Sequence, residues 1–105
     1  MNADELRAKL ASEVGAVGAA ALLPHHRRDA LLVLQPEHDL LDVAVAIALD
    51  SAQEVKRLTV AGNLFKPTLA QVANWIAETG LRFQFVVLQP FVLAQIILEA
   101  DVEQK

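Results

Sequence analysis

The sequence predicts a single α+β domain in which four or five helices pack on a small sheet of two or three strands. One observation is the strand signature that starts at Arg82, where aromatic and apolar side chains alternate with polar ones. A second is the short apolar run Ala30–Leu34, which is typical of a buried strand. A third is a set of helix-start signals, each followed by apolar residues at helical spacing. A sheet of two or three short strands is marginal by itself, so the helices must pack on it.

The first segment is expected to be a helix that begins at a capping box. Asn2 can accept a hydrogen bond from the backbone of Glu5, whose side chain can reach back to the Asn2 amide. Apolar residues then follow at helical spacing, namely Leu6, Leu10, Val14 and Val17. Gly15 and Gly18 each weaken a helix by about 1 kcal/mol relative to Ala, so we expect a break there and then a short apolar turn.

A proline and a charged stretch separate this segment from the first strand. Pro24 disfavours helical geometry at the residue before it, so the segment is expected to end near Leu23. Residues 25–29, His-His-Arg-Arg-Asp, predict a polar loop. The first strand then covers Ala30–Leu34 and stops before Gln35.

Two helices are expected after this strand. Asp39 is a good N-cap, and residues 40–49 are apolar except for Asp42, which predicts a central, buried helix. Ser51 and the glutamate three residues later form a second capping box. The helix that this box begins is expected to end at residue 61, before a glycine.

A short extended segment and one more helix complete the middle of the chain. Residues 64–66 predict a short strand or an extended link. Thr68 with Gln71 is another capping box, and Gly80 ends the helix that it begins. One stripe of this helix, flanked by Trp75, is expected to face the core, and it consists of Leu69, Val72, Ile76 and Thr79.

The longest strongly apolar run is Phe83–Leu98, and Gln89-Pro90 interrupts it. Its first part predicts a strand that begins half exposed and ends buried on both faces. For residues 91–98 the pattern fits a helix or a strand. We expect a helix, because Pro90 suits a first helical position and because Leu31–Leu41 contains the same Val-Leu-Gln-Pro step before a capped helix. The two units would then form a weak internal repeat, although so few matching residues also fit chance.

Composition limits both the architecture and the function. The 105 residues make one domain, 1–105, with frayed ends expected at 1–4 and 101–105. The hydrophobic fraction is 54% and only 21% of residues are charged, so either the core is alanine-rich and tight or apolar surface is buried against a partner. The net charge of −4 does not suit a nucleic-acid binder. The small basic cluster at Arg27 and Arg28 is expected to be a solvated turn.

The sequence also argues against secretion and membrane insertion. There is no cysteine, so disulfides and thiolate chemistry are excluded and a cytoplasmic setting is the default. The first residues are acidic and do not resemble a signal peptide. Val14–Leu23 is too short to span a bilayer, and Phe83–Leu98 carries glutamines and a proline. We therefore expect a cytoplasmic protein with no membrane partner.

Several stretches resemble a known family. They are Asp39–Ala46, Pro67-Thr68 with the helix that carries Trp75, and Val86–Gln95, with Leu6–Leu10 and the Pro24-His25 loop fitting as well. Across most of its length the chain resembles the small bacterial domain of unknown function catalogued under the number 2288. It departs from that family at Phe91, where a Trp usually follows the proline, and at the alanines 19–21, where a Trp is also usual. The resemblance implies no activity, cofactor or substrate.

The histidines give little support to a metal site. His25 and His26 are adjacent, so their side chains diverge. His38 and Asp42 are spaced to share a helix face, but a site would need one or two more ligands. We expect no metal and no cofactor.

Catalytic constellations are equally sparse. Ser12 and Ser51 fit helical positions without an obvious base, and no glycine-rich loop could cradle a phosphate. Asp39, Asp42 and Asp50 could form a carboxylate cluster, but capping explains two of them. Catalysis is therefore disfavoured.

Two functional hypotheses follow. The first is a non-enzymatic protein-interaction or regulatory domain that acts as a homodimer or with a protein partner, because an apolar excess accompanies the lack of catalytic groups. The second is a small-molecule or enzymatic site at the strand ends, where Gln35 and Gln89 would lie with His38 and Asp42. A third, weaker hypothesis is nucleic-acid binding through Arg27 and Arg28. The candidate ligand or interface residues are Gln35, His38, Asp42, Trp75, Gln89, Phe91 and Gln95.

Overall fold

A five-stranded mixed sheet lies between two groups of helices in the computed structural model, which describes residues 2–78 and 80–97. The helices are α1 (Ala3–Ala11), the 3-10 helix η1 (Ala19–Leu22), α2 (Leu23–Arg27), α3 (Leu40–Ala48), α4 (Ala52–Val60) and α5 (Leu69–Ala77). The strands are β1 (Gly15–Gly18), β2 (Leu31–Leu34), β3 (Leu64–Phe65), β4 (Arg82–Leu88) and β5 (Phe91–Ile96). None of the helices in these ranges is long and apolar enough to cross a membrane. The frayed tail predicted for 101–105 lies outside the described residues.

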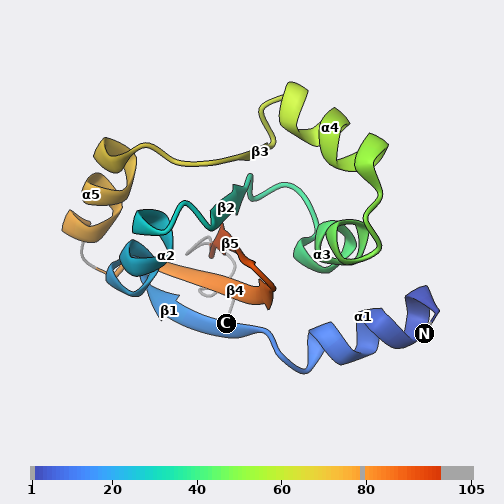
Figure 1. Cartoon of the computed structure of the whole chain (residues 1–105). Helices are drawn as coiled ribbons and strands as arrows, with labels where there is room; N and C mark the ends of the chain where they lie inside the picture. The colour runs from blue at the N-terminus through green and yellow to red at the C-terminus, as the bar shows by residue number, and fades with distance from the viewer. Residues whose placement is uncertain (1, 79, 98–105) are drawn as a thin grey trace.

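The strand order is β1-β4-β5-β2-β3 (Figure 1). The β4–β5 pair is an antiparallel hairpin, and β1 pairs antiparallel with the first half of β4. The β2–β5 pair is parallel, with Leu31 opposite Val92 and Leu34 opposite Gln95. The two-residue β3 pairs antiparallel with the end of β2 and stops before Pro67, which has no N–H to donate to the ladder.

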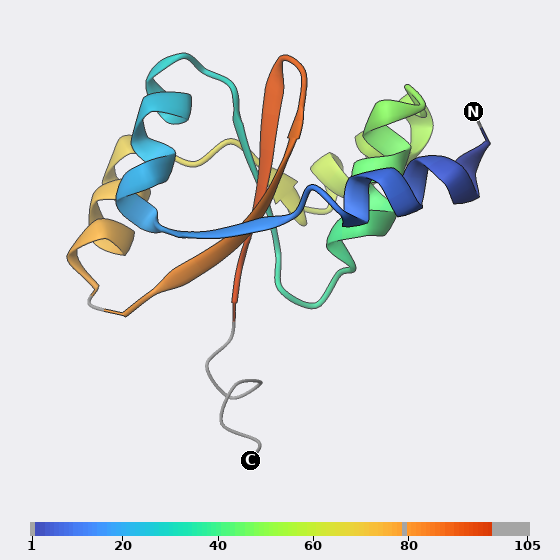
Figure 2. The ribbon, with the colours of Figure 1, turned by 90° about the horizontal axis from the view of Figure 1, so that it is seen from below.

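The two faces of the sheet carry separate apolar clusters. Figure 2 shows α2 and α5 on one side of the sheet and α1, α3 and α4 on the other. Leu34, Val86 and Leu93 belong to the cluster under α1, α3 and α4. Phe83 and Val92 belong to the second cluster, which packs against Trp75 of α5 and the buried residues of η1. The predicted α+β class is confirmed, with five strands rather than the expected two or three.

The helix-start predictions based on local hydrogen bonds are mostly confirmed. Asn2 and Thr68 each make a complete capping box. Asp39 accepts hydrogen bonds from two backbone amides in the first turn of α3. Helix α4 also begins where predicted, but Ser51 makes no side-chain capping bond. Gly62 has a φ of 81°, as expected for a residue that ends a helix.

The region between Val14 and Asp29 differs most from the prediction. The break at Gly15 is real, and the expected short apolar turn follows as η1, but strand β1 comes between them, which was not predicted. A Cβ on Gly15 would lie 2.8 Å from Cε1 of Phe85, so the glycine makes room for the aromatic ring on the paired strand. Pro24 lies in the first turn of α2, where its missing N–H is not needed, and the expected polar loop is therefore largely helical.

Residues 91–96 form strand β5, so the expected helix and the internal repeat are both wrong. Gln89 and Pro90 make the turn of the β4–β5 hairpin, whereas Gln35 and Pro36 lead into a helix. Strand β5 has neighbours on both edges and apolar layers on both faces, and the four residues from Val92 to Gln95 are all buried. A strand enclosed in this way does not alternate, which is why its pattern could not be distinguished from a helix.

Two helices are more exposed than predicted. In α3 only Leu40, Val43 and Ala44 are buried, so the helix has an exposed side. Of the predicted stripe in α5, Val72 is buried whereas Leu69 is 63% and Ile76 40% exposed, and Thr79 lies outside the described residues. Each helix packs on one face of a small sheet and buries only the side chains that contact it. The apolar arc of each helix is wider than the part it buries.

Candidate functional site

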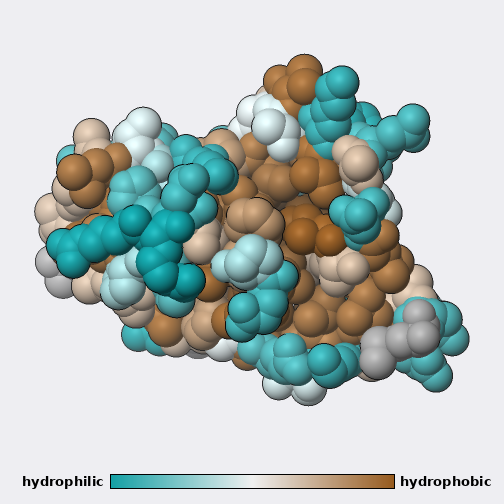
Figure 3. Space-filling view, in the orientation of Figure 1, coloured by the Kyte–Doolittle hydropathy of each residue, from teal (hydrophilic) through white to brown (hydrophobic). Residues whose placement is uncertain are grey.

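An apolar groove of about 1110 Å³ lies between α1, α3, α4 and the sheet. Figure 3 shows it as a brown depression between α4 and α1. We call this hollow the apolar groove. It is lined by Leu6, Lys9, Leu10, Glu13, Leu32, Ile47, Ala48, Asp50, Ala52, Val55, Lys56, Thr59, Leu64, Phe65, Lys66, Val87, Leu88, Gln89 and Phe91.

The floor of the apolar groove comes from strand residues that no helix covers. Leu32 is only half-buried, although the three residues Leu31, Val33 and Leu34 around it are fully buried. Phe91 is half-buried beside it, at the start of β5. The groove is open because α1 packs on α3 but leaves this part of the sheet uncovered. These side chains form an apolar surface that can hold another apolar surface.

Charged residues surround the apolar groove. Lys9 forms an ion pair with Glu13 at 3.8 Å, along the exposed side of α1. Lys66 forms an ion pair with Asp29, outside the groove, at 3.2 Å. Within the part of the chain that the structure describes, Lys56 makes no ion pair. With three lysines against Glu13 and Asp50, the lining has a local charge of +1, from +3 and −2, on a protein whose net charge is −4.

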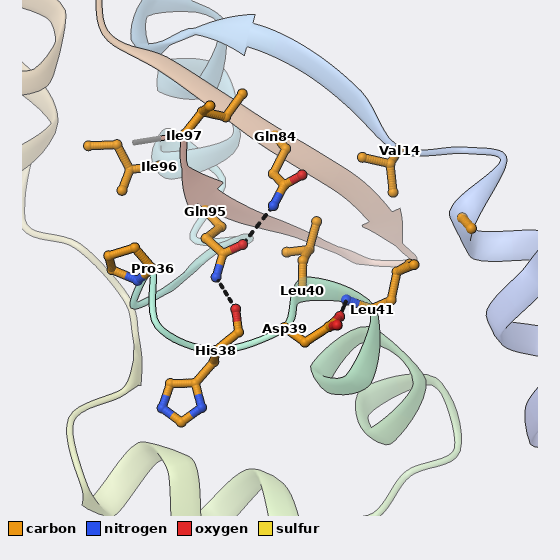
Figure 4. A pocket seen from close by; sticks show the side chains of 11 residues that line it. Val14, Pro36, His38, Asp39, Leu40, Leu41, Gln84, Gln95, Ile96 and Ile97 are labelled. Atoms are coloured by element: carbon orange, nitrogen blue, oxygen red, sulfur yellow. Dashed lines mark hydrogen bonds between the residues drawn. The ribbon is translucent and has the colours of Figure 1, made fainter. Parts of the chain in front are cut away.

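A second hollow, of about 560 Å³, lies where the loop after β2 crosses the sheet (Figure 4). We call it the Gln95 hollow. It is lined by Ala11, Val14, Pro36, His38, Asp39, Leu40, Leu41, Gln84, Gln95, Ile96 and Ile97. It has a larger polar share than the apolar groove, so the two hollows suit different ligands.

Gln95 is the buried polar residue of the sheet, and its amide is fully used. Its Nε2 donates to the backbone oxygens of Gln35, at 2.9 Å, and His38, at 2.6 Å. Its Oε1 accepts a hydrogen bond of 2.7 Å from Nε2 of Gln84. The side chain therefore fastens the 35–38 loop to the sheet, and it has no free N–H to offer a ligand.

Asp42 is occupied by an ion pair between two helices. Arg7 of α1 forms hydrogen-bonded ion pairs with Asp42 and, at 3.3 Å, with Asp39. The hydrogen bond that the Arg7 guanidinium donates to Asp42 raises the Arg7 pKa, and the negative charges of both aspartates act in the same direction. The three side chains are substantially exposed, so they orient α1 on α3 more than they stabilise the fold.

The two Gln-Pro steps do not meet, which overturns the predicted mouth at the strand ends. Gln35 follows β2, next to the end of β5, whereas Gln89 follows β4, next to the start of β5. The two lie roughly 17 Å apart along β5, about five residue steps. In Figure 4 the imidazole of His38 points away from the Gln84–Gln95 pair. The four residues of that hypothesis therefore do not form one site.

The remaining predicted residues lie in different surroundings. The Trp75 ring packs against Phe83, with centroids 5.3 Å apart, on the face opposite the apolar groove. Phe91 and Gln89 line the apolar groove, and Gln95 lines the Gln95 hollow. No sequence pattern joined Phe91 to Leu32, because they come together only through the parallel β2–β5 pairing.

The described residues contain no group of three or more His, Asp or Glu side chains that could hold a metal ion. The guanidinium of Arg28 donates to Nδ1 of His25 at 2.7 Å, so this ring nitrogen is already engaged. Leu6, Ile47 and Val55 line the groove and were not predicted as site residues. Their helical spacing indicated only that they face inward, without distinguishing a covered face from an open one.

Taken together, the three layers and the open apolar groove define a small α+β domain, and its described residues include no cluster that could hold a metal ion. The chain belongs to the family "Protein of unknown function (DUF2288)", which it matches over residues 5–96. It is also similar to the NMR solution structure of PA1075 from Pseudomonas aeruginosa, with 30% sequence identity and a TM-score of 0.77. That match covers 91% of this chain and 88% of the other. None of the curated proteins compared with the chain matches it.

Proposed function

We propose that this chain is a non-enzymatic protein-interaction domain of the bacterial cytoplasm, whose apolar groove binds a segment of a protein partner. The observation that carries the proposal is the uncovered floor of the groove, where Leu32 and Phe91 stay in contact with solvent. An exposed apolar surface of this size costs free energy in water, and a bound partner would remove that cost.

The charges around the groove favour one kind of occupant. Three lysines face it against two acidic residues, and Lys56 makes no ion pair within the described ranges. A short amphipathic helix would place apolar side chains on the floor and acidic side chains beside these lysines. The proposed partner is therefore a protein segment with an apolar face and acidic flanks.

Site-specific photo-crosslinking in living cells tests this proposal. Thr59 lines the groove and is exposed, so a benzoyl-phenylalanine placed there would react with whatever occupies the groove. Ala70, exposed on α5, is the matched control position on the other side of the sheet. We expect a discrete protein adduct from position 59 and not from position 70, and we expect the cross-linked partner peptide to be amphipathic and acidic.

A substitution on the floor provides the second control. Phe91→Asp places a negative charge on the floor, at the first residue of β5, where the side chain is half-buried, and circular dichroism checks that the fold is retained. It should lower the adduct yield at position 59 roughly tenfold, because the charge disfavours both the apolar face and the acidic flanks of the partner. Equal adducts from positions 59 and 70, or adducts that survive in a folded Phe91→Asp variant, would contradict the proposal.

The rival proposal is a small-molecule site in the Gln95 hollow. Its polar side chains are His38, Asp39, Gln84 and Gln95, but the Gln95 amide is committed to three internal hydrogen bonds. A thermal-shift screen of metabolites and metal ions tests it directly. A ligand whose stabilisation is lost in His38→Ala and kept in Phe91→Asp would favour this rival over the groove.

A further inference from the structure

Strand β1 is an edge of the sheet, and nothing in the described residues pairs with its outer side. Figure 1 places it at the margin of the molecule, between α1 and η1. Ala16, at the middle of the strand, is exposed. An unpaired edge of this kind is a template for another strand.

The direction of the backbone groups follows from the hydrogen bonds of β4. The amide of Ile97 donates to the carbonyl of Arg82, so the polar groups of Arg82 point toward β5. Because these groups alternate along a strand, those of Phe83 and Phe85 point toward β1. Their partners in the antiparallel register are Val17 and Gly15, so the N–H and C=O of Ala16 point out of the sheet.

The edge also lacks the features that normally block strand addition. Residues 14–18 read Val-Gly-Ala-Val-Gly, with no charged residue, no proline and little side-chain bulk. Natural edge strands usually carry lysine, proline or a bulge, which prevents pairing with another chain. An edge without these devices, on a protein with 54% hydrophobic residues, is expected to be covered.

We propose that β1 pairs antiparallel with β1 of a second copy of this chain, joining two five-stranded sheets into one across a two-fold axis. This pairing is independent of the apolar groove, which lies on a face of the sheet and not at this edge. The backbone N–H and C=O of Ala16 select the register. They can form hydrogen bonds only with a partner residue whose own backbone N–H and C=O also point out of its sheet. The register with the longest overlap therefore pairs Ala16 with Ala16 of the partner subunit.

This register is sterically self-complementary. It places Val17 opposite Gly15 of the partner subunit, and Val14 opposite Gly18 of the partner subunit. A Cβ on Gly18 would have no atom within 4 Å, so there is open space beside it for a valine side chain. The space above Gly15 is filled by the ring of Phe85, which gives the incoming Val17 an apolar neighbour. A two-fold axis requires such reciprocity, and an unrelated partner strand would not.

A charge-swap experiment at position 16 tests the pairing. Size-exclusion chromatography with light scattering should give twice 11.4 kDa for the unmodified chain at high concentration. Ala16→Lys and Ala16→Asp each place two like charges opposite one another at the axis, and each should weaken the dimer by roughly tenfold or more. Mixing the two variants should restore the dimer, because the axis then carries one positive and one negative charge. Ala70→Lys, an equivalent change on exposed α5, should leave the mass unchanged.

Amide exchange gives a reading that does not depend on mass. The Ala16 N–H should exchange slowly at concentrations where the chain is a dimer, because pairing with the second copy protects it. It should exchange rapidly once the sample is diluted to monomer, and the Ala70→Lys control should behave in the same way. A monomer at millimolar concentration would overturn the proposal. A dimer that persists in both single variants, or one that mixing does not restore, would also overturn it and would place the contact elsewhere, including the apolar groove.

Discussion

Gln95→Met isolates the contribution of one buried amide to the fold. Gln95 is 3% exposed and makes three hydrogen bonds, to Gln84 and to the backbone oxygens of Gln35 and His38. Each is worth about 1 kcal/mol net, so their loss should cost about 3 kcal/mol. Methionine has a similar shape and its additional apolar burial should return about 1 kcal/mol. The expected net loss is about 2 kcal/mol of unfolding free energy, or roughly 10 °C in Tm.

Urea denaturation followed by circular dichroism measures this loss, with the midpoint shifting and the slope unchanged. Gln84→Met removes only one of the three hydrogen bonds and should cost about 1 kcal/mol. Gln53→Met, on exposed α4, makes the same chemical change at the surface and should stay within about 0.5 kcal/mol of the unmodified chain. If Gln95→Met were as stable as Gln53→Met, the amide would not be fastening the 35–38 loop, and the reasoning would fail.

Three further predictions concern core, cap and edge. Leu93→Ala should lose about 3 kcal/mol in the same urea assay, because the side chain is fully buried in the sheet, and a loss under 1 kcal/mol would mean that the cluster collapses around the gap. Asp39→Ala should lose about 1 kcal/mol and speed amide exchange in the first turn of α3, while unchanged exchange there would show that water replaces the cap. Gly15→Ala should destabilise the fold by about 1 kcal/mol, because the ring of Phe85 must move. Gly18→Ala should be neutral or slightly stabilising in dilute samples, because the added methyl group meets open space. Equal effects at the two glycines would refute the close approach of Gly15 to Phe85.

The predictions that succeeded depend on neighbours in the sequence. The caps at Asp39 and Thr68 involve hydrogen bonds within three residues, so a local pattern contains all the information needed. The strand at β4 was also predicted, because one half of it lies next to exposed polar positions and so alternates.

The predictions that failed depend on distant partners. Strand β1 exists because Gly15 pairs with Phe85, 70 positions away, and no local pattern contains that pairing. The same holds for β5, which was predicted as helix because its enclosure between β4 and β2 removes the alternation.

The candidate site was predictable only in part. Phe91 was singled out from the sequence and does line the apolar groove, but its neighbours Leu32 and Val55 were not. An apolar residue that faces an open groove has the same sequence signature as one that faces a closed core. Only the packing of α1 and α4 at the edges of the groove distinguishes the two cases.

The position of β5 in the sheet has a consequence for how the chain is made. Strand β5 is the last of the described strands in the chain, yet it is the strand that joins β1–β4 to β2–β3. Until the ribosome has released residue 96, the nascent chain can form only two separate ribbons, with the edges of β2 and β4 bare. Sheet assembly is therefore expected to wait until β5 has left the ribosome, and the nascent chain would need protection from aggregation during that interval.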